Sequence, residues 1–303
     1  MLNQAITAKA AVGAIIICAV WGGNTPSIKV ALEGLPPLAL AGVRFILGAL
    51  TVLVWVLVAR IPLKPNRREW RFLFTLTALF VLQIYLLHAG TQFTLAAHSG
   101  VFVSTGPFFL AIFAHFFLPG DRLSTIKIVG MSVSFVGVVL IFAEGFLVSA
   151  TDYVVGDAIV LISGMLLGAR QVYTKTLTQS IHPARLLFWQ AALSVPVFFA
   201  LSAIFERGAT FHLDARIITA IVYQGVVIAG LGFIFWTILL RRFNASRLGV
   251  YVFIAPISGV VISYFLLGEP ISNALIVGVI LVGIGIVIVN FKSGDKQSSG
   301  LAP

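Results

Sequence analysis

The sequence predicts an all-α integral membrane protein, in which ten transmembrane helices form two five-helix repeats of inverted topology. Three observations predict this class: an extreme apolar composition, ten apolar segments of membrane-spanning length, and landmarks that recur about half a chain apart. Of the 303 residues, 59% are hydrophobic and 10% are charged, whereas soluble domains are about 25% charged. A water-soluble fold could not bury so much apolar surface, so we expect lipid to cover it.

The apolar segments are each about 20 residues long, which is the length that an α-helix needs to cross the hydrocarbon core. They cover residues 10–29, 38–59, 72–92, 97–118, 126–143, 157–176, 184–205, 216–239, 248–267 and 272–291. Because lipid offers no partner to a free backbone N–H or C=O, we expect these segments to be helices. They lack the alternation of polar and apolar residues that is typical of a porin-like barrel.

Lysine and arginine are distributed unevenly over the connections between the spans. Fifteen of the 20 fall on the side that holds both termini, namely Lys9, Arg60, Lys64, Arg67, Arg68, Arg71, Arg122, Lys127, Lys175, Arg185, Arg241, Arg242, Arg247, Lys292 and Lys296. The opposite side has Lys29, Arg207 and Arg216. Since the cytoplasmic segments of membrane proteins carry the excess of positive charge, the sequence predicts a multi-pass protein of the bacterial inner membrane with both termini in the cytoplasm.

The net charge of +10 would also suit a nucleic-acid-binding protein, but such proteins gather their cations on one face. Here the cations lie in short segments between apolar runs, so we expect membrane lipid and a small-molecule substrate as partners and no nucleic acid. The single cysteine, Cys18, lies inside the first apolar run and excludes an internal disulfide. No cofactor and no metal site is expected, and the oligomeric state stays open.

Landmark residues of the first half recur in the second half at an offset of about 146 to 149 residues, as an internal duplication requires. Gly22, Lys29 and Pro37 correspond to Gly168, Lys175 and Pro183, and Gly100 and Pro107 correspond to Gly249 and Pro256. The sequence therefore predicts an N-terminal repeat over residues 1–145, a C-terminal repeat over 146–292 and a disordered polar tail over 293–303. With five spans each, the two repeats enter the membrane in opposite directions, an arrangement that serves alternating access in carriers.

The first span carries Trp21-Gly22-Gly23-Asn24, the second carries Arg44-Phe45, and Pro256 precedes Gly268-Glu269. These motifs resemble those of the EamA-like branch of the drug/metabolite transporter superfamily. The first half departs from the pattern at Pro119-Gly120-Asp121, and the second half lacks the Trp-Gly motif. The resemblance covers almost the whole chain and implies an exporter, with Asn24 among the substrate-binding residues and Pro107 and Pro256 among the hinges.

The first span carries unusual residues about halfway along its length. Trp21 lies too deep to belong to the belt of interfacial tryptophans. Gly22 and Gly23 permit close backbone approach, and Pro26 removes a backbone hydrogen bond. These residues predict a broken first helix that acts as a hinge and lines a substrate cavity, and tight helix packing around the glycines is the alternative.

Further candidates for substrate binding lie in other spans. Tyr85 and His88 are three residues apart in the third span and share a helical face, and His98 begins the next span. Ionisable residues inside spans are functional candidates by default, although a histidine can also simply bond a neighbouring helix. The second half contributes Tyr223 and Trp236, for which structural roles are the alternative.

Two arginines, Arg44 and Arg170, lie within spans, so each must pair with another group, face water or extend to the interface. An arginine can bind a carboxylate through two parallel hydrogen bonds, which would suit an amino-acid substrate, so either arginine is a candidate for that role. For Arg44 we favour a structural pairing with Glu33 or Glu269.

Acidic and small residues recur at matching places in the two halves. Asp121 precedes Ser124 and Glu269 precedes Ser272, so we expect both carboxylates to cap the helix that follows. Small residues in the fifth and tenth spans predict close helix contact there, either between the two halves or between protomers; they are Gly130, Gly137, Gly278, Gly283 and Gly285.

These features predict an exporter of neutral amino acids, aromatic or branched, that works by alternating access between spans 1–4 and 6–9, since apolar walls with few polar groups suit such a solute. No acidic residue occupies the middle of a span, which favours an uncoupled facilitator, with His88 as the candidate for proton coupling. An exporter of other metabolites or of cationic drugs is the alternative, with aromatic rings as cation–π partners. The spans lack paired carboxylates and a nucleophile–base pair, so we assign no catalytic residue and expect no enzyme.

Overall fold

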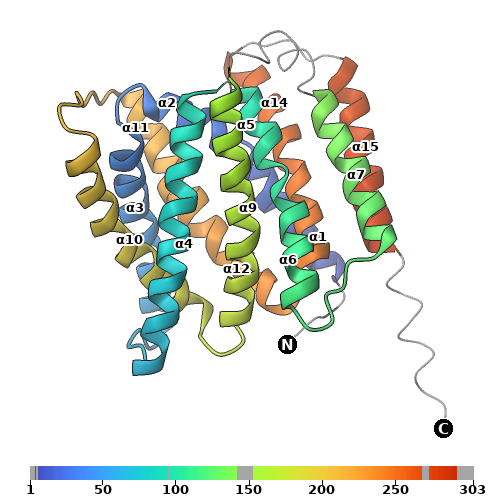
Figure 1. Ribbon diagram of the computed structural model, residues 1–303, viewed down its shortest axis with the longest axis horizontal. Coiled ribbons are helices and arrows are strands. Elements are labelled where there is room, and N and C mark those ends of the chain that lie inside the picture. Colours follow the sequence, from blue (N-terminus) through green and yellow to red (C-terminus); the bar gives the residue numbers. More distant parts are fainter. Residues whose placement is uncertain (1–3, 5, 95, 142–152, 268–272, 292–303) are drawn as a thin grey trace.

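The computed structural model describes residues 4, 6–94, 96–141, 153–267 and 273–291. Their helices run roughly side by side in one bundle (Figure 1). The described residues contain no β-strand, and an isolated bridge joins Gln4 to Phe243. Seven helical segments of this part of the chain are long and apolar enough to cross a membrane, and shorter apolar helices cover Thr125–Leu140 and Ile276–Asn290. The prediction of an all-helical, multi-span membrane protein is confirmed.

Each of the ten predicted spans is helical in the described residues. Six spans are single helices: α3 (Pro37–Val58), α4 (Arg67–Gln92), α7 (Thr125–Ile141), α9 (Val154–Leu177), α10 (Pro183–Phe205) and α15 (Asn273–Phe291). The other four are interrupted: α1 (Ala8–Trp21) with α2 (Asn24–Leu32), α5 (Ala96–Val103) with α6 (Gly106–Phe117), α11 (Ala215–Val222) with the π-helix η1 (Tyr223–Gly232) and α12 (Phe233–Arg242), and α13 (Ala245–Gly249) with the 3₁₀-helix η2 (Val250–Phe253) and α14 (Ile254–Leu267).

The interruption of the fourth span has local causes in the sequence. In the fourth span, the hydroxyl groups of Ser104 and Thr105 donate to the carbonyl oxygens of Gly100 and Phe102, at 2.7 and 2.6 Å, and these bonds compete with the helical ladder. Pro107 then stands in the first turn of α6, where a missing N–H breaks no helical bond. In this span, the helix break and a first-turn proline therefore occur together.

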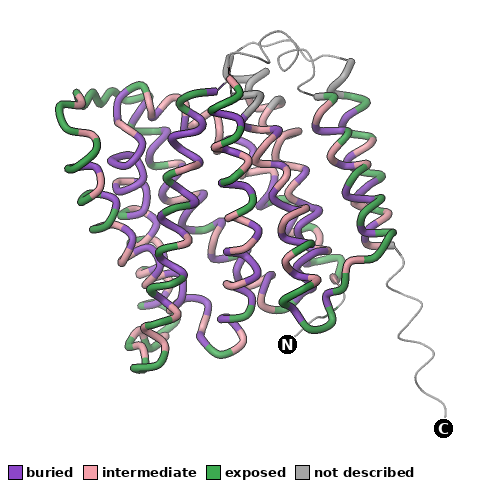
Figure 2. The backbone as a smooth tube through the Cα atoms, viewed as in Figure 1, coloured by how far each residue is buried: buried purple, intermediate pink, exposed green. Residues whose placement is uncertain are grey.

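Exposed residues alternate with buried ones along the helices (Figure 2). Many are large and apolar, such as Val58, Phe116 and Phe205, with 72 to 79% of their surface exposed. Exposed apolar faces of this extent on a soluble protein would promote aggregation. A bilayer around the bundle removes that cost, in agreement with the membrane class.

The two halves of the chain begin at opposite ends of the bundle. In Figure 1, α1 begins at the lower end and α15 ends there, whereas α9 begins at the upper end. Two lysines also occupy related places, one half-buried and one buried. The half-buried Lys29 donates from its Nζ to the carbonyl oxygen of Thr94, just beyond α4, at 2.5 Å. Lys175 Nζ donates to the carbonyl oxygens of Leu240 and Phe243, at the end of α12, at 3.1 and 2.5 Å. Each lysine thus satisfies carbonyl groups that the end of a helix leaves free.

Small residues allow the fifth and tenth spans to pack closely, as predicted. A Cβ on Gly130 would lie 2.8 Å from the carbonyl oxygen of Gly285, and a Cβ on Gly137 would lie 2.7 Å from that of Gly278. The contact joins α7 and α15, one from each half of the chain (Figure 1). Gly283 takes no part in this contact, because its Cβ position has no atom of the described residues within 4 Å, and a contact of this glycine between protomers stays a prediction.

Asp121 joins the two halves near one end of the bundle. Its carboxylate accepts hydrogen bonds from Lys127 Nζ at 2.8 Å and from the backbone N–H of Ser246 at 3.0 Å. The prediction that it caps the following helix is wrong, because Ser124 Oγ accepts the bond from the N–H of Lys127 in the first turn of α7. Glu269 and Ser272, for which we made the same prediction, lie outside the described residues.

Gly285→Ala should destabilise the fold, because the new methyl group would lie 2.1 Å from Ser134 Oγ and 2.3 Å from the carbonyl oxygen of Gly130. Overpacking of this kind costs about 1–3 kcal/mol and is measured as a lower thermal unfolding temperature in detergent. Gly283→Ala is the matched control and should keep or raise that temperature, since alanine favours helix by about 1 kcal/mol. Equal losses in the two variants would contradict the packing argument.

The stability that Asp121 provides should depend on pH. Burial raises the pKa of its carboxyl, but the charge of Lys127 and the hydrogen bonds from Lys127 and Ser246 outweigh burial and hold the pKa below its usual value. The carboxylate therefore stabilises the fold above the unfolded pKa of about 3.9, and this contribution disappears as the pH falls through the folded pKa.

Accordingly, Asp121→Asn should lower the free energy of unfolding at pH 7 by about 1.5–3 kcal/mol, the usual range for hydrogen bonds to a charged group. The difference from the wild type should shrink in unfolding curves recorded below pH 4. Asp214→Asn is the control: this half-exposed residue caps α11, and asparagine caps equally well. A difference for Asp121→Asn that stays constant down to pH 3 would refute the linkage.

Candidate substrate-binding site

The first span is broken at Gly22 and Gly23, as predicted. The N–H groups of both glycines bond three residues back, to Ala19 and Val20, instead of four, and α2 restarts at Asn24 with Pro26 in its first turn. A Cβ on Gly22 would lie 2.5 Å from the carbonyl oxygen of Ala255. Tight packing against α14, the alternative considered for these glycines, therefore applies to Gly22.

Tyr223 lies beside this break. Its hydroxyl donates to the carbonyl oxygen of Val20, and a Cβ on Gly23 would lie 2.6 Å from the same hydroxyl. Tyr223 also begins η1, the ten-residue π-helix in the eighth span. π-Helical turns are rare and occur mainly at functional sites, and no feature of the sequence led us to expect one here.

The wide turns of η1 bring the eighth span close to the first. A Cβ on Gly232 would lie 2.5 Å from Trp21 Nε1, so only glycine leaves room for the indole. The ring of Trp21 packs against Trp236, with centroids 5.1 Å apart, and against Phe233 at 6.2 Å. Trp236 in turn donates its Nε1–H to Gln171 Oε1 on α9, at 3.2 Å.

Three phenylalanines extend this contact into an aromatic cluster that draws on both halves of the chain. Phe45 on α3 lies 4.6 Å from Phe80 on α4, and Phe233 lies 6.4 Å from both, measured between ring centroids. We define the aromatic cluster as Trp21, Phe45, Phe80, Phe233 and Trp236. Phe80 and Phe233 were not among the predicted residues, because the chain has 25 phenylalanines and no local signal separates these two from the rest.

Arg44 lies beside the cluster and is 2% exposed. Its Nη1 lies 3.5 Å from His88 Nε2, and His88 Nδ1 lies 3.1 Å from the carbonyl oxygen of Pro37. Because an arginine can only donate and a carbonyl can only accept, these contacts assign His88 as neutral, with its proton on Nδ1. His88 thus accepts a hydrogen bond from Arg44 and positions its guanidinium group. The pairing that we favoured with Glu33 is wrong, since Glu33 binds Arg216 at 3.1 Å, and Glu269 lies outside the described residues.

Arg170 adjoins the same cluster. Its guanidinium carbon is 5.0 Å from the ring centroid of Phe80 and 5.8 Å from that of Phe233, which is within cation–π distance. Its side chain is buried and its Nε has no hydrogen-bond partner among the described residues.

Other buried polar atoms also lack a partner in the described part of the chain. Trp21 Nε1 and Arg44 Nε belong to or adjoin this cluster, Asn24 Oδ1 and Gln224 Oε1 lie on α2 and η1, and the others are Thr77 Oγ1, Gln83 Oε1 and Thr174 Oγ1. Gln224 Nε2 donates to the carbonyl oxygen of Ser27, one turn along α2 from Asn24, at 2.8 Å. Buried polar atoms without a protein partner call for water or a ligand, so the groups beside the cluster identify the candidate site.

Not every predicted residue joins this site. Tyr85 is 37% exposed and lines an apolar groove of about 620 Å³ between α4 and α10, together with Thr77 and Pro196. It therefore faces the lipid side rather than the interior that holds His88. His98 lies on α5, but its side chain is outside the described residues. Pro256, like Pro107, stands in the first turn of a helix, here α14.

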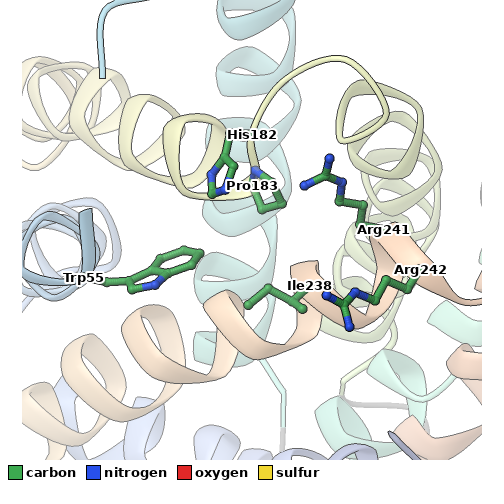
Figure 3. A pocket seen from close by; sticks show the side chains of 6 residues that line it. All are labelled: Trp55, His182, Pro183, Ile238, Arg241 and Arg242. Carbon is green, nitrogen blue, oxygen red and sulfur yellow. The ribbon is translucent and has the colours of Figure 1, made fainter. Parts of the chain in front are cut away.

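A second pocket opens at the end of the bundle and is shown in Figure 3. It has a volume of about 180 Å³ and is lined by Trp55, His182, Pro183, Ile238, Arg241 and Arg242. Burial and the charges of Arg241 and Arg185 lower the pKa of His182. Ligand pockets usually measure about 300–1,000 Å³, and this pocket contains none of the predicted site residues. We therefore place the candidate site at the aromatic cluster.

Comparison with known proteins agrees with a transporter. The chain is 27% identical to a probable amino-acid metabolite efflux pump of Escherichia coli, over 92% of this chain and 94% of that protein. It is 25% identical to a probable terminal-alkyne amino-acid exporter of Streptantibioticus cattleyicolor, over 97% of each chain. It is 23% identical to the uncharacterized transporter YoaV of Bacillus subtilis, over 95% of this chain and 99% of that one.

A solved crystal structure shares the fold, with a TM-score of 0.79 and 18% identity over 93% of this chain and 98% of that chain. The model of the EamA-like transporter family matches the chain twice, over residues 8–143 and over residues 154–291. Together with the multi-span helical fold, this match confirms the resemblance seen in the motifs: the chain belongs to the EamA-like transporter family and is a membrane transporter rather than an enzyme.

Proposed function

We propose that this protein exports neutral amino acids, aromatic or branched, across the bacterial inner membrane. The observation that carries the proposal is the aromatic cluster, which combines residues of both halves and is flanked by buried polar atoms without protein partners. An amphipathic solute of this size needs apolar walls and a few polar contacts. The names of the Escherichia coli and Streptantibioticus relatives support amino acids as the substrate class.

Alternating access between two inverted repeats is the mechanism that we propose. Three findings support it: the family model matches each half once, α1 and α9 begin at opposite ends of the bundle, and Lys29 and Lys175 bond the ends of the third and eighth spans. An inverted repeat can adopt two related arrangements, each open to one side of the membrane. The two repeats that we propose cover residues 1–145 and 146–292. Both termini lie in the cytoplasm in this proposal, because most lysines and arginines fall on the side that holds them.

The substrate side chain would occupy the aromatic cluster, and the broken helices would move around it. Trp21 and Trp236 belong to the cluster and Arg170 adjoins it. Asn24 and Tyr223 lie at the break in the first span. Interrupted helices can change direction at low cost because their hydrogen bonding is already incomplete. The hinge positions that we propose are Gly22, Gly23, Pro26, Pro107 and Pro256.

Transport down the solute gradient, without proton coupling, fits the chemistry of the spans. The described carboxylates lie at or near helix ends, so none is placed to carry a proton through the middle. His88 is held neutral between a cationic donor and a backbone acceptor, and protonating it would break the contact with Arg44. An intramembrane titratable group is what coupling requires.

Counterflow into proteoliposomes tests the function. Vesicles loaded with unlabelled phenylalanine should accumulate labelled phenylalanine, and Trp21→Ala should slow the initial rate about 10-fold or more, since burial of an aromatic ring is worth about 1.5–3 kcal/mol. Trp55→Ala, at the end pocket, is the control and should keep the wild-type rate. The absence of any flux of phenylalanine, leucine or threonine through folded protein would overturn the proposal.

Uncoupled transport makes a second prediction. Imposing a pH gradient of one unit across the vesicles, or abolishing it with a protonophore, should leave the final accumulation of labelled phenylalanine unchanged, because no proton crosses with the solute. The measurement compares plateau levels in the same preparation with and without the gradient. Accumulation that follows the pH gradient would show coupling and reassign His88 as the titrating group.

A further inference from the structure

The interior of the protein holds positive charge without a balancing negative charge. Arg44 and Arg170 are 2% and 8% exposed, and an arginine keeps its proton under physiological conditions. Neither has a carboxylate within ion-pair distance among the described residues. Burying an unpaired charge is among the most expensive features a fold can carry.

The carboxylates of the described residues all have partners elsewhere. Two bind arginines near the ends of helices, one binds a lysine, and the others bind hydroxyl groups, backbone N–H groups or a histidine. The pairs are Glu33 with Arg216, Glu69 with Arg185, Asp121 with Lys127, Asp157 with Thr94, Glu206 with the N–H groups of Leu38 and Ala39, and Asp214 with His212. None of them neutralises the two interior arginines.

Both guanidinium groups adjoin the aromatic cluster. Arg170 lies over Phe80 and Phe233, while Arg44 lies 5.3 Å from the ring of Phe45, which itself touches Phe80. Both arginines retain a buried Nε–H donor without a partner, as does the indole of Trp21. Three unused donors from three different spans thus lie around one group of rings.

Building on the proposed function, we propose that Arg44 and Arg170 bind the carboxylate of the transported solute. A carboxylate satisfies donors in pairs and neutralises the local charge, while the rings hold the rest of the molecule. Asn24 Oδ1 and Gln224 Oε1 are unused acceptors on the adjoining α2 and η1, and they suit the ammonium group of an amino acid. A cationic amine without a carboxylate would meet two like charges and is excluded.

Binding measurements test this assignment independently of transport. Trp21 and Trp236 lie in the cluster, so tryptophan fluorescence of the purified protein in detergent reports occupancy, with the thermal unfolding temperature as a second readout. The probes are phenylalanine, 3-phenylpropionate, phenylalanine methyl ester and phenethylamine. Phenylalanine and phenylpropionate should bind, and the two probes without a carboxylate should bind at least about 10-fold more weakly, because a site built for a charged group rejects an analogue that lacks it.

Variants of the two arginines test whether these side chains bind the carboxylate. Arg170→Gln and Arg44→Gln should each weaken binding of the two carboxylates about 10-fold or more and bring their affinity close to that of phenethylamine. Arg216→Gln, an exposed arginine paired with Glu33, is the matched control and should keep the preference. Should Arg44→Gln fold poorly, the four probes on the wild type still decide the question.

Two results would overturn the assignment: phenethylamine binding as tightly as phenylalanine, or no binding of either carboxylate at millimolar concentration. Flux of amino acids in proteoliposomes combined with equal binding of amine and acid would refute the arginine site while leaving the exporter intact. Binding of carboxylates without flux of any amino acid would support the site and overturn the proposed function.

Discussion

A polar group inside the bilayer has no water to bond, so it needs a partner within the protein or on a bound solute. Many polar contacts in the interior of this protein follow from that constraint. Lys29 and Lys175 satisfy carbonyl groups at helix ends, and Tyr223 satisfies Val20 beside the break in the first span. Polar contacts between spans therefore hold irregular backbone in place where apolar packing alone could not.

The same constraint makes the unsatisfied atoms informative. Native proteins leave few buried polar atoms without a partner, yet Arg44, Arg170, Trp21 and Asn24 each have one. The atoms of Trp21, Arg44 and Arg170 belong to or adjoin the aromatic cluster, whereas Thr77, Gln83 and Thr174 also carry buried atoms without a partner among the described residues. Unused donors beside a cluster that joins both halves suit the solute-binding site that we propose.

Closely packed helices and interrupted helices are combined in one fold. The fifth and tenth spans pack through glycines, backbone against backbone, and are uninterrupted helices. The first, fourth, eighth and ninth spans contain breaks, a π-helix or a 3₁₀ turn. In the alternating-access mechanism that we propose, the interrupted spans change direction while this uninterrupted pair keeps the two halves in contact.

The sequence by itself determined the membrane class, the ten helical spans, the break at Gly22 and Gly23, and the family. These properties depend on composition, segment length and the backbone preferences of glycine and proline, all of which are local. Helical spacing could not decide which way a side chain faces: Tyr85 and His88, three residues apart, lie on the lipid side and in the interior.

Only the tertiary structure decided the partners across the bundle. It paired Glu33 with Arg216 instead of Arg44, placed His88 behind Arg44, and brought Phe80 and Phe233 to Arg170. These contacts depend on the rotation and register of each helix against its neighbours. Small residues such as Gly232 set that rotation and register by allowing close packing. No single segment carries that information, because each contact joins residues that are distant along the chain.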